Sequence, residues 1–396
     1  MALSKATVDD QGLVQFAQKL VRTPSVSTHE GALAQAMVAE LEQAGCSDVW
    51  VDAMGNVIGR VGSGARPILL FDGHMDTVDI GEASRWERDP FGGEIVDGVL
   101  YGRGAADMKG GLASMVYAAK AVAAAKSRLR GTLYVVGVVQ EEPCEGLAVQ
   151  HAIEAEGLRP DWVVLGEPTN LQIARGHRGR IALEITVRGR ACHASMPEQG
   201  VNAIYQAARV VVGVELLAAQ LGEDSFLGRG SIAVTDIRSV AGSRNAVPDA
   251  CSLYLDRRLT GGETGAKAIA ELRSIISREG VDASIQVDEY QATSYTGHQV
   301  RGRQEFEAWA TPANHHLVIT AASVVERALG YVPRVRRWEF STDGVYTAAV
   351  AGLPTIGFGP GEERYAHTSE EQVRVRDLES AARVYAELAM RLLGES

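Results

Sequence analysis

The stretch Gly131-Thr-Leu-Tyr-Val-Val-Gly-Val-Val-Gln140 is a continuous apolar run, and it is followed directly by two glutamates, Glu141 and Glu142. Such a run predicts a buried strand that ends in a loop. Proteins of the α/β class build their sites at the ends of strands of this kind. Two adjacent carboxylates repel one another and are costly to desolvate. An enclosed pocket at this point would therefore need a cation to hold them, or would have to protonate one of them.

The sequence before this strand, and the part shortly after it, alternates between helical and extended patterns. Helical spacing covers 31–45, 108–126 and 147–156, and extended patterns cover 49–61, 67–71, 131–140 and 161–165. Strands that alternate with helices favour a mostly parallel sheet covered on both faces. The fold class predicted for the first 178 residues is therefore α/β.

From Gly179 onward the pattern changes. Residues 181–188 alternate between apolar and polar side chains, as a half-exposed strand does. A helix (203–221), two strands (230–240 and 250–259), a helix (263–279) and a strand (281–290) follow. The order βαββαβ is typical of a ferredoxin-like domain. The α/β alternation resumes with a helix at 317–329, strands at 332–336 and 354–358, and a helix at 377–393. We therefore predict a catalytic domain made of 1–178 and 293–396, with a smaller domain, 179–292, inserted in it.

Length and composition limit the classes of function. A chain of 396 residues exceeds what one hydrophobic core usually supports, so two domains are expected. A net charge of -11 with only 39 Lys and Arg argues against nucleic-acid and anionic-membrane partners and favours a small substrate. The start of the chain, 1–10, lacks a signal-peptide pattern, and charged residues interrupt every long apolar stretch. The four cysteines are scattered without a Cys-x-x-Cys pair, which favours a reducing cytoplasm.

Candidate metal ligands are distributed along the predicted catalytic domain. They are His74 and Asp76 in Phe71-Asp-Gly-His-Met-Asp-Thr-Val78, Asp107 in Tyr101-Gly-Arg-Gly-Ala-Ala-Asp-Met-Lys-Gly-Gly111, Glu167 in Gly166-Glu-Pro-Thr169, and His367. Zinc binds imidazole nitrogen and carboxylate oxygen, and two metal ions a few ångströms apart need a shared ligand that offsets their repulsion. Together with Glu141 and Glu142, these residues predict a two-metal hydrolase.

A role can be predicted for each of these side chains. Asp107 is the expected bridge between the metals, because the glycines around it let the backbone fold closely. His74 and Glu167 then remain for one ion, and Glu142 and His367 for the other. Asp76 lies two residues past His74, where it would accept a hydrogen bond from the ring nitrogen that does not bind metal. Glu141 is not needed as a ligand and is placed to take a proton from water.

Simpler explanations exist for each signal alone. An isolated histidine is most often a surface or capping residue, the Gly102-x-Gly104 segment could be a turn, and the paired glutamates could be a solvated loop. All of these motifs together, from His74 through Asp107, Glu141 and Glu167 to His367, are hard to obtain by chance in one chain. The adjacent pair His315 and His316 lies in a polar segment with no acidic partner close in sequence, so we assign it to the surface.

This set of motifs resembles the dinuclear-zinc aminoacylase and carboxypeptidase family that includes acetylornithine deacetylase and succinyl-diaminopimelate desuccinylase. The resemblance covers nearly the whole chain and rests on Gly73-His-Met-Asp76, Gly102-Arg-Gly-Ala-Ala-Asp-Met-Lys-Gly110, Glu141-Glu142, Gly166-Glu-Pro168, Gly189-x-x-x-His193, Asn245-Ala-Val-Pro248 and His367. Within the family, the chain is most similar to the YgeY-type hydrolases, described as linked to selenium metabolism. That similarity rests on Gln140-Glu-Glu, Asp224-Ser-Phe-Leu-Gly, Ser243-Arg, Leu255-Asp-Arg-Arg-Leu-Thr260, Phe340-Ser-Thr and Gly357-Phe-Gly-Pro-Gly361. The family commonly has Asp where this chain has Gln140.

The resemblance implies further roles. The peptide bond after Asp107 is expected to be cis, a strained arrangement tolerated at functional sites. The inserted domain is expected to act as a lid and as the dimerisation domain of a homodimer, and His193 is expected to reach the partner's site and donate to the oxyanion. Arg258 resembles a clamp for a substrate carboxylate, since a guanidinium fork suits a planar carboxylate. Arg178, Asn245 and Thr342 are weaker candidates for substrate contacts.

The sequence therefore predicts a metal-dependent amidohydrolase that acts on a small N-acyl or N-carbamoyl amino acid. The expected nucleophile is a water bridging two divalent ions, which we take to be Zn²⁺, although Co²⁺ and Mn²⁺ also suit these ligands. A metallo-dipeptidase or carboxypeptidase is the alternative within enzymes. A catalytically silent binding protein on the same scaffold is a more distant one, because a binding protein would need neither Glu141 nor His193.

Overall fold

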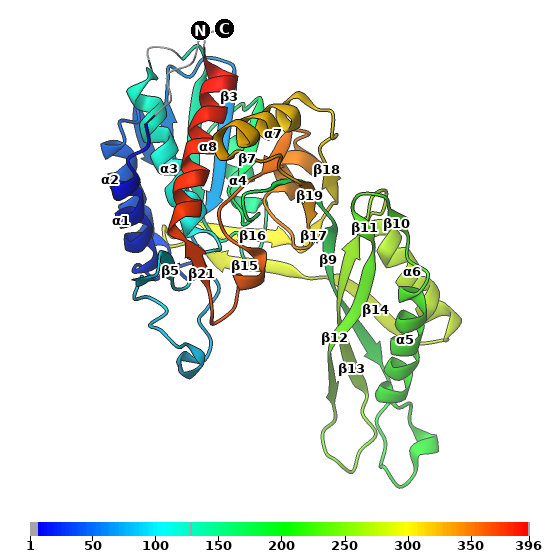
Figure 1. Ribbon diagram of the computed structural model, residues 1–396. Helices are drawn as coiled ribbons and strands as arrows, with labels where there is room; N and C mark the ends of the chain where they lie inside the picture. Colours follow the sequence, from blue (N-terminus) through cyan, green and yellow to red (C-terminus); the bar gives the residue numbers. More distant parts are fainter. Residues whose placement is uncertain (1–6, 127–128, 395–396) are drawn as a thin grey trace.

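A nine-stranded sheet forms the centre of the larger lobe of the computed structural model, which describes residues 7–126 and 129–394 (Figure 1). In spatial order its strands are β1 (Asp48–Val51), β2 (Val57–Val61), β6 (Thr132–Val138), β3 (Ile68–His74), β7 (Trp162–Leu165), β20 (Thr355–Gly357), β8 (Ile173–His177) and β18 (Trp309–Ala310), and β19 (Val335–Trp338) also pairs with β8. Residues 1–6, which include part of the segment expected to lack a targeting signal, lie outside the described residues.

The centre of this sheet is parallel. β6, β3, β7 and β20 run in the same direction, and antiparallel pairs lie at both ends of the sheet. Every residue of β3 and β6 is buried, as expected for strands covered on both faces. The continuous apolar run that predicted a buried strand is thus explained, and the α/β fold class is confirmed.

Six α-helices belong to the larger lobe in the described part of the chain. They are α1 (Asp10–Val21), α2 (Gly31–Gln43), α3 (Lys109–Ala124), α4 (Leu147–Glu154), α7 (His316–Leu329) and α8 (Val375–Leu393). Helices α3 and α8 pack on one another and on the central strand β3. The alanine-rich sequence of α3 permits this close packing, and fourteen of its sixteen residues are buried. A three-stranded sheet of β21 (Gln372–Arg374), β5 (Val99–Tyr101) and β4 (Ile95–Val96) lies beside these helices.

The inserted segment forms the smaller, elongated lobe. Its elements follow the predicted order βαββαβ as β9 (Gly179–Arg188), α5 (Ala203–Ala218), β12 (Ser231–Val240), β13 (Ala250–Leu259), α6 (Gly265–Arg278) and β14 (Ala283–Val287). The sheet order is β12, β13, β9 and β14, and the short β17 (Glu305–Phe306) also pairs with β9. Leu183, Ile185, Leu253 and Leu272 are among the side chains of a second hydrophobic core that this lobe encloses. A two-stranded ribbon of β10 (Glu223–Asp224) and β11 (Gly228–Arg229) precedes β12.

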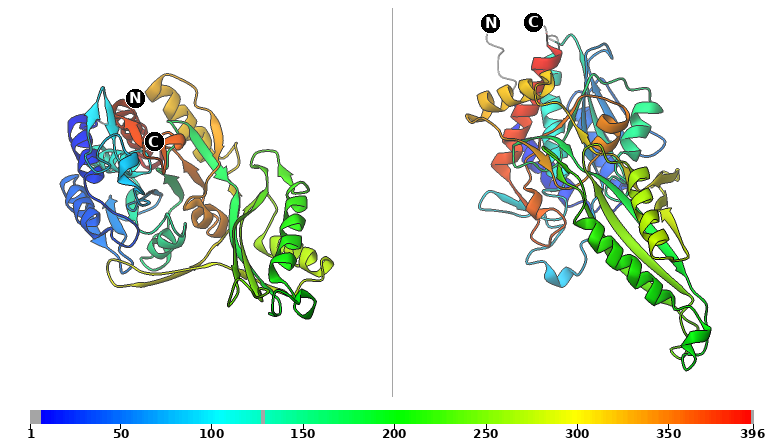
Figure 2. Two further views of the ribbon diagram at one scale, coloured as in Figure 1. Left: turned by 90° about the horizontal axis from the view of Figure 1, so that it is seen from below. Right: turned by 90° about the vertical axis from the view of Figure 1, so that its right-hand side faces the viewer.

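Two predicted strands are each two strands in the structure. The extended pattern at 49–61 is the hairpin of β1 and β2, because the Asp52 side chain accepts hydrogen bonds from the main-chain N–H groups of Gly55 and Asn56 and closes a turn. The pattern at 281–290 is β14 followed by β15 (Glu289–Thr293), which pairs with β16 (Gln299–Arg303). The hairpin of β15 and β16 runs from the smaller lobe back along the larger one (Figure 2). At its tip, the Tyr295 hydroxyl donates to the carbonyl oxygen of Gly55 at 2.8 Å.

The structure also shows the state of the four cysteines and the character of the helices. Cys144 and Cys251 are buried, and Cys46 and Cys192 are half-buried, and all four are free thiols. Within residues 7–126 and 129–394, no helix has the length and apolar character needed to cross a membrane.

Candidate metal centre

The candidate site lies at the carboxyl ends of the parallel strands β3, β6 and β7, where four acidic or imidazole side chains lie at or just after the strand ends. In the sheet register, His74 at the end of β3 pairs with Val138 of β6, and Asp72 pairs with Leu165 of β7. Glu141 and Glu142 follow β6, and Glu167 follows β7. Parallel strands end at one edge of a sheet, so residues far apart in sequence meet there.

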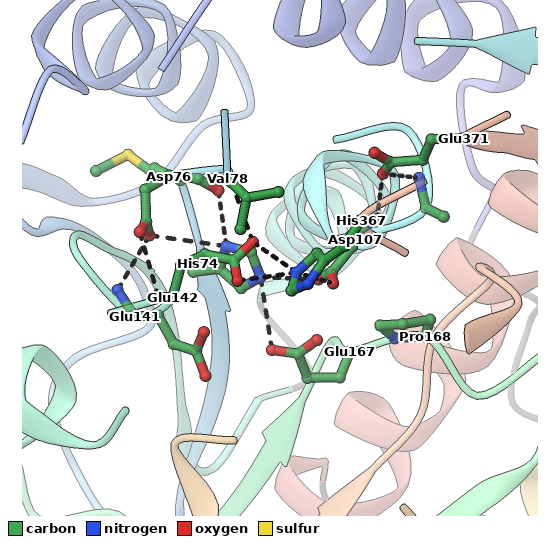
Figure 3. Close-up of polar contacts among 12 residues, drawn as sticks. His74, Asp76, Val78, Asp107, Glu141, Glu142, Glu167, Pro168, His367 and Glu371 are labelled. Atoms are coloured by element: carbon green, nitrogen blue, oxygen red, sulfur yellow. Dashed lines mark hydrogen bonds and ion pairs between the residues drawn. The ribbon is translucent and has the colours of Figure 1, made fainter. Parts of the chain in front are cut away.

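Asp107 lies between two histidines (Figure 3). Its Oδ1 is 3.0 Å from His74 Nε2, and its Oδ2 is 3.3 Å from His367 Nε2. Each carboxylate oxygen therefore faces a different imidazole, which is the arrangement expected of a ligand shared by two metal ions. The peptide bond between Asp107 and Met108 is cis, as the family resemblance predicted.

The remaining predicted ligands surround these three side chains. Glu142 Oε2 is 2.9 Å from His367 Nε2, and Glu167 Oε1 is 3.6 Å from His74 Nε2. One ligand atom each from His74, Asp107 and Glu142 lie within 4.8 Å of one another, and so do those of His74, Glu141 and Glu167. The structure thus brings together all five predicted metal ligands, with Glu141 beside them.

The hydrogen bonding of His74 indicates that the residues fit a cation. Its Nδ1 contacts the main-chain carbonyl oxygen of Asp76 at 2.8 Å and must donate to it. A neutral ring then presents an unprotonated Nε2, whose lone pair points at the Asp107 carboxylate only 3.0 Å away. Two lone pairs at this distance repel unless the ring is protonated or a cation lies between them. A divalent metal ion, which takes imidazole nitrogen and carboxylate oxygen as ligands, meets this requirement.

The charge of the site indicates the same need. Burial and the neighbouring Glu167 raise the pKa of Glu141 well above its ordinary value, and burial and Asp107 do the same for the pKa of Glu167. Hydrogen bonds to Asp107 and Glu142 raise the pKa of His367 to about 10. Without metal, some of these carboxylates would be protonated, or they would form ion pairs with protonated histidines. With divalent ions, all of them can be ionised.

The two adjacent glutamates have different surroundings. Glu142 is held by His367, whereas Glu141 is only 5% exposed and its Oε1 has no hydrogen-bond partner in the described structure. A buried, unpaired carboxylate oxygen carries a desolvation cost and needs an explanation. A proton-transfer role at the site would supply one.

Asp76 contacts the site differently from the prediction. The ring nitrogen of His74 bonds to the main-chain oxygen of Asp76, and the Asp76 carboxylate is 3.7 Å from that nitrogen. The carboxylate instead accepts hydrogen bonds from the main-chain N–H groups of Glu141 and Glu142 and from the Ser27 hydroxyl. Asp76 therefore positions the loop that carries both glutamates.

Sequence reasoning missed a buried ion pair behind Asp107. Glu371 Oε1 accepts hydrogen bonds from the main-chain N–H groups of Ala106 and Asp107, and its Oε2 is 2.6 Å from Arg103 Nη1. Glu371 is 264 positions from Asp107 and 268 positions from Arg103, so no local sequence pattern joins them. The arginine within Gly102-Arg-Gly104 was the one available signal, since a buried arginine requires an acidic partner.

A cavity of about 400 Å³ opens onto the predicted metal ligands. Its wall includes Asp107, Glu141, Glu142, Glu167 and His367 and, from other segments, Glu145, Arg180, Arg258, Phe340, Ser341, Glu363 and Ala366. Of the predicted substrate contacts, Arg258 lines this cavity. Arg178 instead donates to Glu339 and to the carbonyl oxygen of Arg229. Thr342 is fully buried and shares a hydrogen bond with His177, and its neighbour Ser341 takes the place at the wall.

His193 and Asn245 lie in two exposed loops, after β9 and after β12, at the end of the smaller lobe far from the sheet of the larger one (Figure 1). The loops contact each other through a bridge between His193 and Ala246. The His193 ring is bonded to the Ser195 hydroxyl at 2.7 Å. Within one chain, these two residues are therefore remote from the predicted metal ligands. The pair assigned to the surface behaves as predicted: His315 caps α7 and His316 is exposed.

The chain is similar to known proteins over nearly its whole length. The model of peptidase family M20/M25/M40 matches residues 70–391. The protein YgeY of Escherichia coli (strain K12), described as uncharacterized, is 38% identical over 390 residues, which cover 98% of this chain and 96% of that protein. A succinyl-diaminopimelate desuccinylase of Stenotrophomonas maltophilia (strain K279a) is 31% identical over 387 residues, which cover 95% of this chain and 97% of that protein. The crystal structure of an M20 family metallo-carboxypeptidase from Sulfolobus solfataricus superposes with a TM-score of 0.77 at 19% identity, covering 98% of this chain and 99% of that one.

Proposed function

The chain belongs to peptidase family M20/M25/M40, and from this membership we propose that it hydrolyses the amide bond of a small N-acyl or N-carbamoyl amino acid. Its class, a metal-dependent hydrolase of amide bonds, follows from the family and from relatives such as the desuccinylase. The observation that carries the finer proposal is the position of Asp107 between His74 and His367, with the unpaired Glu141 beside them.

Two divalent metal ions would be held by five side chains. His74 and Glu167 would bind one ion, Glu142 and His367 would bind the other, and Asp107 would bind both. Zn²⁺ is the expected metal, and Co²⁺ and Mn²⁺ suit the same nitrogen and oxygen ligands. Such ions, when bound, lower the pKa of water and polarise a carbonyl group.

Glu141 would transfer the protons of the reaction. Its buried carboxylate would take a proton from the attacking water and return it to the amine that leaves. Asp76 supports this role, because its hydrogen bonds to the main chain of Glu141 and Glu142 fix the loop. Arg258, which lines the same cavity, would hold the free carboxylate of the substrate and place the scissile bond over the ligands.

We further propose that the inserted domain, 179–292, acts as lid and dimerisation domain, and that the protein acts as a homodimer in the cytoplasm. Large apolar side chains are exposed on α5 and on β12, which is an edge strand: Ile204, Tyr205, Val212, Leu216, Ile237 and Val240. An exposed apolar patch on an edge strand and its helix supports association with a second copy. His193 and Asn245, which lie far from the ligands of their own chain, would then contribute to the partner's site.

A metallo-dipeptidase or carboxypeptidase is the second candidate. A dipeptide offers the same amide bond and a free carboxylate, which Arg258 would hold equally well. The metallo-carboxypeptidase with a similar fold is compatible with this choice. A catalytically silent binding protein is disfavoured, because binding alone gives no reason to bury Glu141 with an unpaired oxygen.

The test is a screen of the metal-loaded protein against N-acetyl, N-succinyl and N-carbamoyl amino acids and dipeptides, with release of the amine as the measurement. We expect turnover of one class, abolished by a chelator and restored by Zn²⁺, Co²⁺ or Mn²⁺. The Glu141→Gln variant is the control for contaminating hydrolases. Turnover that persists in this variant, or that ignores the chelator, would contradict the proposal.

A further inference from the structure

Two arginines face each other across neighbouring strands in the wall of the cavity. Arg180 of β9 and Arg258 of β13 are direct partners in the antiparallel register. Residues directly opposite one another in this way project from the same face of a sheet, with Cβ atoms roughly 5 Å apart. Both side chains line the cavity that also contains Asp107, Glu141 and Glu167.

A pair of like charges at such a position is unfavourable by itself. Directly opposed like charges destabilise a sheet. Here one carboxylate lies beside each arginine: Asp256 Oδ1 is 2.7 Å from Arg258 Nε, and Glu145 Oε2 is 3.2 Å from Arg180 Nη2. Burial raises the pKa of Glu145, and the charges of Arg180 and Arg258 both oppose that shift, so Glu145 lies near both guanidiniums. The two guanidiniums thus border one region that suits negatively charged oxygen atoms.

Both arginines have N–H groups that make no hydrogen bond in the described part of the chain. Within the described part of the chain, Arg180 donates only through Nη2, to Glu145 and Gln304, and Arg258 donates through Nε and Nη2 to Asp256. The Phe306 ring lies under the Arg180 guanidinium, 5.3 Å from its carbon to the ring centroid. This stacking and the bond to Gln304 hold the guanidinium in place, so little rotamer freedom remains to be lost when an anion binds.

We propose that Arg180 binds the carboxylate of the substrate together with Arg258, so that two guanidiniums from neighbouring strands hold the anionic end of the substrate. The inference rests on the proposed function, because it specifies the group bound at the same site. Arg180 then determines specificity: it favours a carboxylate over a neutral group of the same shape. An ion pair of Arg180 and Glu145 that merely joins the two lobes would show no such discrimination.

Binding of non-hydrolysable probes tests this without reference to turnover. Metal-loaded wild-type protein is titrated calorimetrically with succinate and with 4-oxopentanoate, which carries a neutral methyl ketone in place of one carboxylate. Both probes offer one carboxylate to the metals, and they differ only in the charge of the second end. We expect succinate to bind at least about tenfold more tightly, since hydrogen bonds between charged groups are worth roughly tenfold to a hundredfold in affinity. In Arg180→Gln this preference should fall several-fold, because only Arg258 then holds the carboxylate, and in Arg180→Lys it should be intermediate, because lysine keeps the charge and loses the fork.

Two further variants separate substrate binding from a structural role. Arg188→Gln, at the exposed far end of β9, is the matched control and should keep the wild-type preference. Glu145→Gln removes the carboxylate that competes for Arg180, so succinate should bind with equal or greater affinity. A purely structural pair predicts instead that Arg180→Gln and Glu145→Gln weaken both probes alike.

A full preference for succinate in folded Arg180→Gln, or no preference in the wild type, would overturn the inference. Neither result would bear on hydrolysis. An inactive protein with a normal succinate preference would leave this inference standing while the proposed function failed.

Discussion

Glu141 and Glu142 are adjacent in sequence, yet only one of them is paired with a histidine. Glu142 contacts His367, whereas Glu141 has a buried oxygen without a partner. We therefore expect Glu141→Gln to keep both metals and to lose turnover by roughly a hundredfold to ten-thousandfold, the usual size of a general-base contribution. Glu142→Gln should lose occupancy of one metal. Elemental analysis of the purified variants, with the release of amine measured in parallel, checks both expectations.

The opposite pattern would reverse these assignments. If Glu141→Gln is depleted of metal and Glu142→Gln is fully loaded, Glu141 is a ligand and Glu142 the candidate base. The proximity of Glu141 to His74 and Glu167 makes this outcome a real alternative.

His177 gives a prediction about stability and pH. Burial lowers the pKa of this histidine to about 4, and its ring bonds to Thr342 and to the carbonyl oxygen of Arg178. The folded state keeps the ring neutral, while the unfolded state gains a proton below about pH 6.5. The stabilising contribution is therefore complete above pH 6.5 and is lost as the pH falls toward 4. The difference amounts to about 3 kcal/mol.

Unfolding by urea, with a chelator present, measures this contribution. The stability of the wild type relative to His177→Gln should shrink by about 3 kcal/mol between pH 7 and pH 4. Contributions of other titrating groups are common to both proteins and cancel in the comparison. A difference that does not change with pH would show that His177 is not held neutral.

Single residues were predictable from the sequence where they follow a strand or sit in a glycine-rich turn. His74, Glu142, Glu167 and Asp107 belong to this kind, and the structure brings them together. Contacts between distant segments were not predictable. Glu145 and Arg180 meet only because β9 of the inserted lobe starts beside the loop after β6. A shift by one residue also reverses the direction of a side chain, so that Ser341 lines the cavity and Thr342 is buried behind it.

The loop that carries Asp107 depends on an element from the other end of the chain. Glu371, just before β21, accepts two main-chain hydrogen bonds from this loop and pairs with the buried Arg103. Breaking a buried ion pair by removing one partner typically costs about 3–5 kcal/mol. We expect this loss of unfolding free energy in Glu371→Gln, together with weaker metal binding, because Asp107 is no longer held.

Urea unfolding without metal and a competition assay for metal affinity measure the two effects. Glu82→Gln is a matched control, because Glu82 pairs with Arg85 at the surface, where both side chains are more than 70% exposed. Exposed pairs contribute about 1 kcal/mol or less. A Glu371→Gln variant as stable as this control would show that the pair does not support the loop.

Elements with a strong hydrophobic period were predictable, and turns inside an extended pattern were not. The central strand β6 and the order of the inserted lobe agree with the prediction. The hairpin of β1 and β2 was merged into one strand, since the turn depends on an Asp52 side chain that bonds to the backbone. The hairpin of β15 and β16 was not recognised, because its partner surface, near Gly55, lies 240 residues earlier.

At the scale of the whole molecule, the position of His193 raises the question of which site it serves. The loop that carries it lies at the end of the smaller lobe that is far from the sheet of the larger one (Figure 1). Exposed apolar residues on α5 and the edge strand β12 offer a surface for a second copy. A two-fold axis at such a surface would use the same patch on both chains, and the two distal loops would be exchanged between them.

Complementation between two inactive variants tests this exchange. Glu141→Gln retains His193, and His193→Ala retains Glu141, so a mixed dimer has one site with both groups intact. Random exchange of subunits places about half of the dimers in the mixed form, so roughly a quarter of the wild-type activity should return. A mixture of the Arg188→Gln and Glu141→Gln variants is the reference. It contains the same share of inactive Glu141→Gln chains, but every chain keeps His193. If activity does not return after subunit exchange has been demonstrated, or if a monomer is fully active, His193 does not act across the dimer. The inserted lobe would then serve its own chain, and its distal loops would have to move toward the cavity to do so.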